Sequence, residues 1–582
     1  MKICIIAEKP SVARDIARMV GANAKHDGYL EGCDYLVTWA IGHLITLSMP
    51  EAYGFTTYKA EDLPIHPKPF RLMVRQVRRD KEYHNDPAAL KQLNVIRSCF
   101  DKADRIIVAT DAGREGELIF RYIYTYLNCQ KPFDRLWISS LTDKSIREGL
   151  AQLKVGTDYD NLYHSAKARS EADWLVGINA SRALSIARQG GYSLGRVQTP
   201  TLAMICRRYI AHRDFTSVTY WKLSILTEKE GILLKATSDT LFDTEATAQT
   251  ALGHLNRQQR LLVQSVTRKI GETLPPLLYD LTTLQKDANR KHGFSADKTL
   301  SLAQSLYEKK VTTYPRTGSR YISEDVFEEV PALLHALGAT LVAPFNRHPV
   351  DDGKVTDHHA LLPTGEVASN LTPDETTVFQ MICARFVEAF SPSSQEERMQ
   401  VVFTDDVNTY TWKGCQQLSL GWKAVQQQQT PSEEDSDEQS LVLLPHLVEG
   451  EVLSLNFAEV TAHTTKPQPL FTEATLLSAM EHAGKEVEDD ESRKALTDCG
   501  IGTPATRANI IETLILRDYI RQNKKTIIPT EKGLAVYDIV KDKKIANAEM
   551  TGAWEVDLAA IEAGAASAAD FAHRIHDYTA QI

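Results

Sequence analysis

Segment 105–120 (RIIVATDAGREGELIF) gathers acidic side chains where an apolar run gives way to a helix-like pattern. Asp111 and Glu115 flank Gly113, and Glu8 follows a second apolar run in MKICIIAEKP. Carboxylate oxygens are the ligands that Mg²⁺ takes in proteins, with water filling the remaining positions. The same acids also suit the first turn of a helix, where the helix dipole favours negative charge. By itself the segment leaves both interpretations open, a metal site and an acidic helix start.

The two apolar runs are predicted strands, and each precedes a predicted helix. Ligand sites in open parallel sheets gather at the carboxyl ends of the strands. If the two strands are neighbours, Glu8, Asp111 and Glu115 converge, and three carboxylates are enough for one Mg²⁺. Glu117 lies two residues past Glu115 and points elsewhere on the helix. We therefore assign it no more than the orientation of a ligand.

A second candidate centre lies in segment 311–323 (VTTYPRTGSRYIS). Pro315 biases Tyr314 toward an extended backbone. A phenol with a pKa of about 10 is a weak nucleophile at neutral pH, and the guanidinium of Arg316 would stabilise its phenolate and grip a phosphate. Tyr–x–Arg therefore suits attack on a phosphodiester. A partly buried loop tyrosine beside a surface arginine is the alternative, and without context it is preferred.

Three further segments combine glycine, hydroxyl and basic side chains as anion-binding helix N-termini do. Helix caps and hydrogen-bonded histidines would explain each segment without a ligand, and for each segment alone that explanation is preferred. The residues are Arg196 and Gln198 in YSLGRVQTPTL, His358 and His359 in DHHALLPTG, and Thr503, Thr506 and Arg507 in GIGTPATRANII.

The elements that must position these residues indicate a multidomain chain with α/β, helical and β-rich parts. The 582 residues suggest roughly four domains at about 150 residues each. Repeated strand-then-helix units predict a mostly parallel sheet near the N-terminus. A β-rich pattern recurs on both sides of a helical stretch, which indicates that one domain is inserted into another.

Composition narrows the class of protein. A net charge of −10 argues against a uniformly basic nucleic-acid surface but allows a local groove, and the basic segment 68–80 is interpreted as a solvated face. Eight cysteines without a C-x-x-C pair disfavour zinc modules and suit a reduced cytoplasmic protein with buried thiols. No apolar run approaches the ~18 residues that cross a bilayer, so no membrane association is expected. The acidic insert 426–440 is predicted to be a disordered loop.

Taken together and in this order, the motifs resemble those of the type IA DNA topoisomerases, in particular the bacterial topoisomerase III branch. The resemblance runs from residue 3 to about 555 and includes EMTGAWE near the C-terminus. It implies a toroid of four domains around a central hole. These would be a Toprim α/β domain (1–155), a helical DNA-binding domain (156–215 and 461–582), a β-rich arch (216–275 and 400–460) and a helical gate carrying the tyrosine (276–399).

The resemblance also implies a reaction. Single-stranded DNA would be cut without ATP through a 5′-phosphotyrosine at Tyr314, and strand passage and religation would relax negative supercoils and decatenate DNA. Glu8, Asp111 and Glu115 match the Mg²⁺-binding acids. Lys9 matches the lysine that protonates the leaving 3′-oxygen, Arg316 the arginine that stabilises the transition state, and His358 a histidine near the scissile phosphate. The residues placed along the DNA groove are Arg196, Gln198, Thr503, Thr506 and Arg507.

Two positions depart from the family pattern. The Toprim motif usually reads Asp–x–Asp–x–Glu, and here its middle acid is Gly113. The tyrosine motif often carries an acid where this chain has Gly318. Another Toprim enzyme, a metal-dependent nuclease or primase, and a catalytically impaired single-stranded DNA-binding protein therefore remain as alternatives. The expected partners are single-stranded DNA, a RecQ-like helicase and a single-strand binding protein, acting with a monomer.

Overall fold

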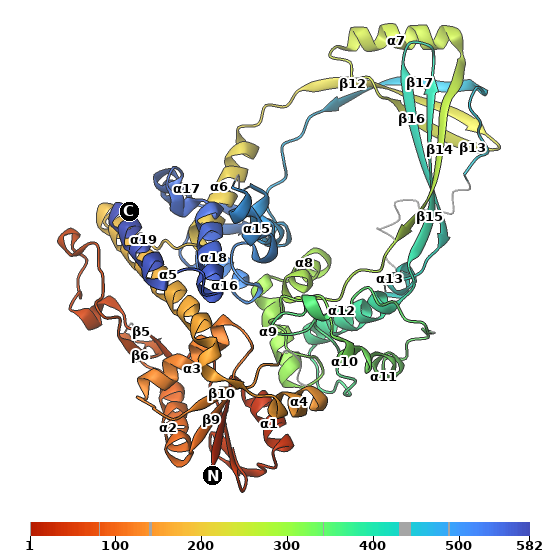
Figure 1. Cartoon of the computed structure of the whole chain (residues 1–582). Helices are drawn as coiled ribbons and strands as arrows, with labels where there is room; N and C mark the ends of the chain where they lie inside the picture. The colour runs from red at the N-terminus through yellow and green to blue at the C-terminus, as the bar shows by residue number, and fades with distance from the viewer. Residues whose placement is uncertain (1, 81, 139–141, 342, 430–443, 487–488) are drawn as a thin grey trace.

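The computed structural model describes the whole chain except residues 1, 81, 139–141, 342, 430–443 and 487–488. Figure 1 shows four parts arranged in a ring around a central opening, which agrees with the expected toroid. Most of the predicted disordered loop 426–440 falls outside the described residues. Its first residues do not, and they belong to helix α13 (Lys423–Gln429).

The N-terminal part is an α/β sheet of seven strands in the order β11-β10-β9-β1-β4-β3-β2. Its four central strands run parallel, whereas β2, β3 and β11 pair antiparallel at the edges. The expected mostly parallel sheet is thus confined to the centre, because β2, β3 and β4 follow one another through turns too short for a crossover helix. The strands are β1 (Ile3–Ala7), β2 (Ala24–His26), β3 (Tyr29–Glu31), β4 (Tyr35–Trp39), β9 (Arg105–Ala109), β10 (Phe133–Arg135) and β11 (Lys154–Val155).

Helices cover both faces of this sheet. Helix α1 (Pro10–Met19) begins with a proline in its first turn, as predicted, and packs with α4 (Asp143–Ala151) on one face. Helices α2 (Pro87–Lys102) and α3 (Arg114–Tyr126) pack on the other. Because helices cover both faces, the carboxyl ends of the parallel strands are accessible only along one edge of the sheet, and a ligand site is expected there.

The basic segment lies beside this sheet in two small hairpins. Strands β5 (Ile45–Leu47) and β6 (Leu72–Val74) form one, and β7 (Gln76–Arg79) and β8 (Glu82–Asn85) form the other. Four of its basic side chains, Lys68, Arg71, Arg78 and Arg79, are exposed, as a solvated face requires.

A helical domain joins two distant parts of the sequence around one apolar core. The core is lined by the small and branched residues of α5 and α6 from the first part and by α14 to α19 from the second. The helices are α5 (Asp160–Ala187), α6 (Gln198–Arg213), α14 (Glu473–Glu481), α15 (Asp490–Cys499), α16 (Pro504–Leu516), α17 (Glu531–Val540), α18 (Ala548–Glu562) and α19 (Ala568–Gln581), with the hairpin β18 (Ile520–Asn523) and β19 (Thr526–Pro529).

The arch at the far side of the ring is a closed six-stranded barrel in the order β12-β13-β16-β15-β14-β17. Two sets of its strands continue out of the barrel as ribbons, one of the two strands β12 and β17 and one in which β16 accompanies β14 and β15. The pair β12/β17 runs to the helical domain and β14/β15 runs to the gate (Figure 1). The elements are β12 (Thr219–Lys229), β13 (Ile232–Ser238), α7 (Glu245–Gln258), β14 (Arg260–Thr273), β15 (Ser394–Thr404), β16 (Thr409–Ser419) and β17 (Val452–Thr464).

Two strand limits differ from the expected domain limits. Strand β15 begins at Ser394 rather than at 400, and β17 ends at Thr464 rather than at 460. The first residues of β15 read SQEERMQ, and the buried face there includes Glu396, which is ion-paired with Arg398. Because a buried position carries a charged residue, apolar alternation does not mark the start of this strand.

The gate domain is helical and touches both neighbours. Its helices are α8 (Leu281–His292), α9 (Ala296–Glu308), α10 (Glu324–Phe327), α11 (Val330–Ala336) and α12 (Pro373–Phe390). Thr142 and Ser145 at the start of α4 both donate to Oδ2 of Asp325 in the gate, at 3.1 and 3.0 Å. On the opposite side, Nζ of Lys286 lies 2.7 Å from Oε2 of Glu481 in the helical domain. The gate therefore closes the ring through polar contacts with the N-terminal domain on one side and with the helical domain on the other.

Thiol burial is only partly as expected. Cys4, Cys99 and Cys206 are buried, but Cys33 and Cys415 are exposed.

Within the part of the chain that the structure describes, no helix combines the length and apolarity that crossing a bilayer requires.

Candidate active site

The first acidic pair comes from adjoining strands. Strands β1 and β9 are parallel neighbours, with Ala7 opposite Ala109, so Glu8 and Asp111 leave the sheet at the same edge. The side chain of Glu8 accepts a hydrogen bond from the backbone of Asp111. Burial raises the pKa of Glu8, and the nearby charge of Asp111 adds to this effect.

Lys9 lies between these acids. Its Nζ is 2.6 Å from Oδ2 of Asp111 and 3.7 Å from Oε1 of Glu8. Burial alone would lower the pKa of Lys9, but Asp111, Glu8 and Tyr314 outweigh it and raise the pKa. Two partly buried carboxylates therefore hold a charged ammonium group at the end of the sheet.

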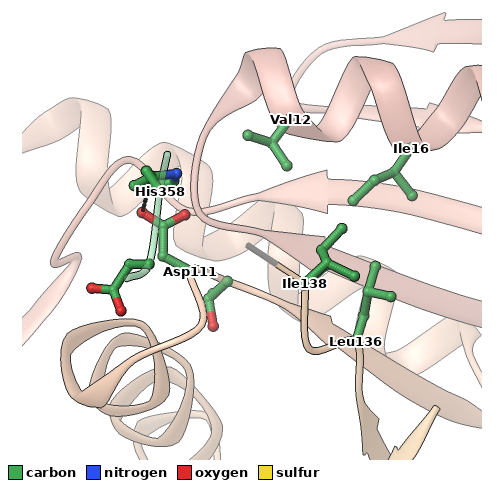
Figure 2. Close-up of a pocket in the computed structure, with 9 residues that line it drawn as sticks. Val12, Ile16, Asp111, Leu136, Ile138 and His358 are labelled. Atoms are coloured by element: carbon green, nitrogen blue, oxygen red, sulfur yellow. Dashed lines mark hydrogen bonds and ion pairs between the residues drawn. The ribbon is translucent and has the colours of Figure 1, made fainter. Parts of the chain in front are cut away.

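The gate domain reaches the same point with two rings. Nε2 of His358 lies 2.9 Å from Oδ2 of Asp111 (Figure 2), and the His358 ring packs edge-on against Tyr314 with centroids 4.8 Å apart. Burial would raise the pKa of Asp111, but the contacts with His358 and Lys9 dominate and hold it well below its usual range. His359 instead lies with Nδ1 2.7 Å from the carbonyl oxygen of Ala360. The structure thus places His358, not His359, at the site.

Tyr314 is half-buried beneath Lys9, whose Nζ is 3.5 Å from the ring centroid. Burial raises the pKa of the Tyr314 phenol, Asp111 and Glu8 raise it further, and Lys9 and Arg316 oppose them. The phenol is therefore protonated at neutral pH in this closed arrangement. Arg316 itself is exposed and forms no hydrogen bond or ion pair with the described residues, so it is available to a ligand.

Glu115 does not join Glu8 and Asp111. Its side chain is 58% exposed, with Oε2 3.2 Å from Nε2 of His43 and Oε1 3.9 Å from Nη1 of Arg169. Among the described residues, no three histidine, cysteine or acidic side chains are grouped so as to hold a metal ion. The donor chemistry still fits Mg²⁺, because two carboxylates suffice when phosphate and water complete the coordination.

A buried arginine that the sequence did not single out fixes the end of β9. Arg135 is 1% exposed and donates from Nη1 to the carbonyl oxygen of Thr110 at 2.7 Å and from Nη2 to that of Asp111 at 2.6 Å. Its counter-ion is Glu117, also 1% exposed, with Oε2 3.2 Å from Nε. Glu117 thus acts on Asp111 through Arg135. The only sequence signal is a charged residue inside the strand-like run DRLWIS.

The glycine that follows Glu115 has a steric role. A Cβ at Gly116 would lie 2.1 Å from the carbonyl oxygen of Asp111, so the loop can fold onto the first turn of α3 only with glycine there. This close approach places the carbonyl oxygen of Asp111 within reach of Arg135.

The two arginines predicted to line a DNA groove are buried in protein contacts. Arg196 is 4% exposed and pairs with Asp173 at 2.9 Å and Glu555 at 3.3 Å. Arg507 is 2% exposed and donates to Oγ1 of Thr282 in the gate at 2.9 Å. In this conformation both arginines join protein segments together.

The predicted hydroxyl and amide side chains are more accessible and lie at helix starts. Gln198 opens α6, where its Nε2 donates to the hydroxyl of Ser193 at 2.9 Å. Thr503 is the N-cap residue of α16, and its hydroxyl lies 3.1 Å from that of Thr506. These helix N-termini remain candidates for phosphate contacts.

Comparisons with known proteins agree with this arrangement. A family model described as DNA topoisomerase matches residues 157–573, and one described as Toprim domain matches residues 3–141. DNA topoisomerase 3 of Bacillus subtilis strain 168 is 40% identical over 609 residues, which cover 100% of this chain and 81% of that protein. DNA topoisomerase 3 of Bacillus cereus strain ATCC 14579 is 40% identical over 606 residues, with the same coverage.

A solved structure shares the fold. Full-length topoisomerase I from Thermotoga maritima superposes with a TM-score of 0.72 at 23% identity, covering 100% of this chain and 90% of that one. At this identity the likeness concerns the fold, including the ring of Figure 1.

Proposed function

Because the chain belongs to the type IA DNA topoisomerase family, with a Toprim domain at its N-terminus, we propose that Tyr314 cuts one DNA strand and later reseals it. The observation that carries the proposal is the position of Tyr314. It lies in the gate domain, yet it packs against Lys9 of the Toprim domain, whose amine is bound to Asp111. Nucleophile, proton donor and acidic pair thus meet only where two domains touch.

The proposed cleavage transfers a phosphoryl group from DNA to the protein. Oη of Tyr314 gives its proton to water and attacks the phosphorus atom, and the bond from phosphorus to the 3′-oxygen breaks. The products are a 5′-phosphotyrosine and a free 3′-hydroxyl. Because an alkoxide is a poor leaving group, it needs a proton, and the ammonium of Lys9 is placed to give one. Arg316, exposed beside Tyr314, would stabilise the charge on the phosphoryl oxygens.

Resealing is the reverse reaction. The 3′-hydroxyl attacks the phosphotyrosine and gives its proton to the neutral amine of Lys9, while the phenolate of Tyr314 leaves and takes a proton from water. The covalent bond keeps the free energy of the broken phosphodiester, so ATP is not required. When bound by Glu8 and Asp111, Mg²⁺ would reduce the charge repulsion around the phosphate. These two acids, with phosphate and water as further ligands, form the minimal site.

Passage of DNA requires the gate to move. The cavity between Asp111, His358 and the Toprim sheet has a volume of about 20 Å³ (Figure 2), which is room for roughly one water molecule. A DNA strand therefore enters only when the gate separates from the Toprim domain. In the ring of Figure 1 the same movement would admit a second strand to the central opening. Single-stranded DNA is the proposed substrate, with relaxation of negative supercoils and decatenation as outcomes.

A covalent trapping experiment tests the proposal. A single-stranded oligonucleotide labelled at its 3′ end is incubated with protein and Mg²⁺ and then denatured. Label should migrate with the protein, whereas label at the 5′ end should appear in a free fragment. Tyr314→Phe should abolish both signals, and Tyr307→Phe, a change in the neighbouring ring, should keep them.

The same experiment separates the alternatives. A Toprim nuclease would release both labelled ends and would tolerate Tyr314→Phe. A DNA-binding protein without activity would release neither label. Relaxation of supercoils by Tyr314→Phe protein would contradict the proposed mechanism directly.

A further inference from the structure

None of the described residues of the β7/β8 hairpin belongs to the apolar cores that pack on the Toprim sheet. Arg78 stands opposite Tyr83 in this hairpin, and Gln76 stands opposite Asn85. Side chains directly opposite each other in an antiparallel pair, and those two residues apart along a strand, project from the same face. One face of the hairpin therefore presents a guanidinium, a phenol ring and two amides, and no carboxylate lies among these four side chains.

This face is free in the described structure. Tyr83 is 67% exposed and Arg78 is exposed, and no side chain of the face forms a hydrogen bond or ion pair with the described residues. The opposite face differs, because Glu82 stands there opposite Arg79, with its Oε2 3.8 Å from Nε2 of His84. A carboxylate weakens the positive charge of that face, so the face with Arg78 is the one suited to an anion.

The hairpin is attached to the edge of the sheet where the acidic pair lies. Ala40 follows β4, and its backbone N–H donates to the carbonyl oxygen of Ala7 at 2.8 Å. The loop after β4 therefore leaves the sheet beside the end of β1. Arg75, the residue before β7, donates from Nη1 to two carbonyl oxygens of this loop, that of Ile41 at 3.1 Å and that of His43 at 3.3 Å.

Further bonds hold the base of the hairpin in place. Nη2 of Arg75 lies 2.6 Å from Oδ2 of Asp86, the residue after β8, so one guanidinium joins both ends of the hairpin to the loop. The loop in turn reaches the start of α3, where Nε2 of His43 lies 3.2 Å from Oε2 of Glu115. At about 3.3 Å per residue, Arg78 lies roughly 10 Å along the strand from Arg75. The free face thus lies within a few nucleotides' length of the strand ends.

We propose that single-stranded DNA leaving the active site at this edge binds the free hairpin face, which is formed by Gln76, Arg78, Tyr83 and Asn85. The guanidinium binds a phosphate, and an unpaired base stacks on the exposed phenol ring. The ring selects a single strand, because bases in a duplex are already stacked on one another. This inference rests on the proposed function, since it extends the binding of the same substrate beyond the active site.

Binding of a fluorescently labelled oligothymidine tests the inference in full-length Tyr314→Phe protein without Mg²⁺. Fluorescence anisotropy should show that Tyr83→Ala weakens binding by about fivefold or more, the effect of losing one stacked base. Arg78→Ala should reduce the slope of log affinity against log salt by about 0.7, the value for one phosphate contact. The controls Arg97→Ala and Tyr126→Ala, at exposed positions of α2 and α3 in the same domain, should match the parent protein.

Photocrosslinking locates the contact directly. An oligothymidine with a single 5-iodouracil should crosslink to a peptide that contains Tyr83, as identified by mass spectrometry. Moving the modified base along the strand should give a maximum at one distance from the cleavage position. A thermal melt of each variant verifies folding.

Three results would overturn the inference: unchanged affinity in Tyr83→Ala, an unchanged salt slope in Arg78→Ala, or an equal loss of affinity for a duplex of the same length. The last result would assign the face to double-stranded DNA. Failure of the proposed function is a separate outcome. It would appear as covalent trapping by Tyr314→Phe, and that result does not depend on the hairpin variants.

Discussion

Lys9 lies over the face of Tyr314 with its Nζ atom 3.5 Å from the ring centroid. An ammonium group over a phenol ring is held by the ring's negative face, and it favours the phenolate if the proton leaves. The contact also spans two domains, one carrying each residue. In the proposed reaction, Lys9 would therefore act twice, first beside the nucleophile Tyr314 and then as the proton donor to the leaving oxygen.

Removal of Lys9 should slow cleavage by about 10² to 10⁴-fold, the usual contribution of a general acid. A substrate with sulfur in place of the 3′-oxygen should restore most of the rate to Lys9→Ala, because a thiolate leaves without a proton. Single-turnover cleavage of the two substrates measures the effect. Arg316→Ala provides the control, since its loss should not be repaired by sulfur. Equal defects of Lys9→Ala on both substrates would exclude the role of acid.

Cleavage should accelerate with pH. The pKa of Tyr314 is raised above its ordinary value by burial, so the phenolate fraction grows about tenfold per pH unit through the neutral range. Lys9, whose pKa is also raised, stays protonated over the same range. Single-turnover rates between pH 6 and pH 9 should rise without levelling. A plateau near pH 7 would mean that another group accepts the proton.

Loss of the Glu117 carboxylate should destabilise the Toprim domain. Glu117→Gln leaves the charge of buried Arg135 uncompensated, which costs about 3 to 5 kcal/mol. Urea unfolding of the full chain monitors the loss. Glu115→Gln, which changes an exposed carboxylate two residues earlier, should shift the midpoint by far less. Similar midpoints for the two variants would show that Arg135 does not depend on Glu117.

The contact between α4 and the gate should set how often the ring opens. Ser145→Ala removes one donor to Asp325 and should cost about 1 kcal/mol, a roughly fivefold shift toward the open state. Single-molecule energy transfer between labels on the Toprim domain and the gate measures the populations. Ser145→Thr retains the hydroxyl and should behave like the unmodified protein. An unchanged population in Ser145→Ala would place the controlling contact elsewhere.

The sequence predicts local features of the site well. Apolar runs that end at Glu8 and near Asp111 become β1 and β9, and Pro10 begins α1 as expected. Because those strands are neighbours in the sheet, their two acids meet at one edge. Such features depend on residues close together in the chain or on general rules for parallel sheets.

Contacts between domains could not be predicted in the same way. Glu115 lies between His43 and Arg169, the latter brought close because α5 packs beside α3. Arg196 is buried because Asp173 and Glu555 approach it from two helices. Asp357 meets Gly113 only through docking of the gate. Each of these depends on surfaces far apart in sequence, and no local pattern records them.

The two ribbons that leave the barrel determine how the ring can deform. Strands β14 and β15 stay paired from Leu262 and Thr404 in the barrel to Thr273 and Ser394 beside the gate, and β12 and β17 stay paired to the helical domain. A ladder of hydrogen bonds resists sliding and stretching. The two-stranded β12/β17 ribbon can twist more than the ribbon toward the gate, where β16 pairs with β15 as a third strand. In the proposed reaction, the arch would therefore let the gate turn away at fixed connection lengths and would return Tyr314 to the same place, so that a cut strand meets again the end from which it was severed.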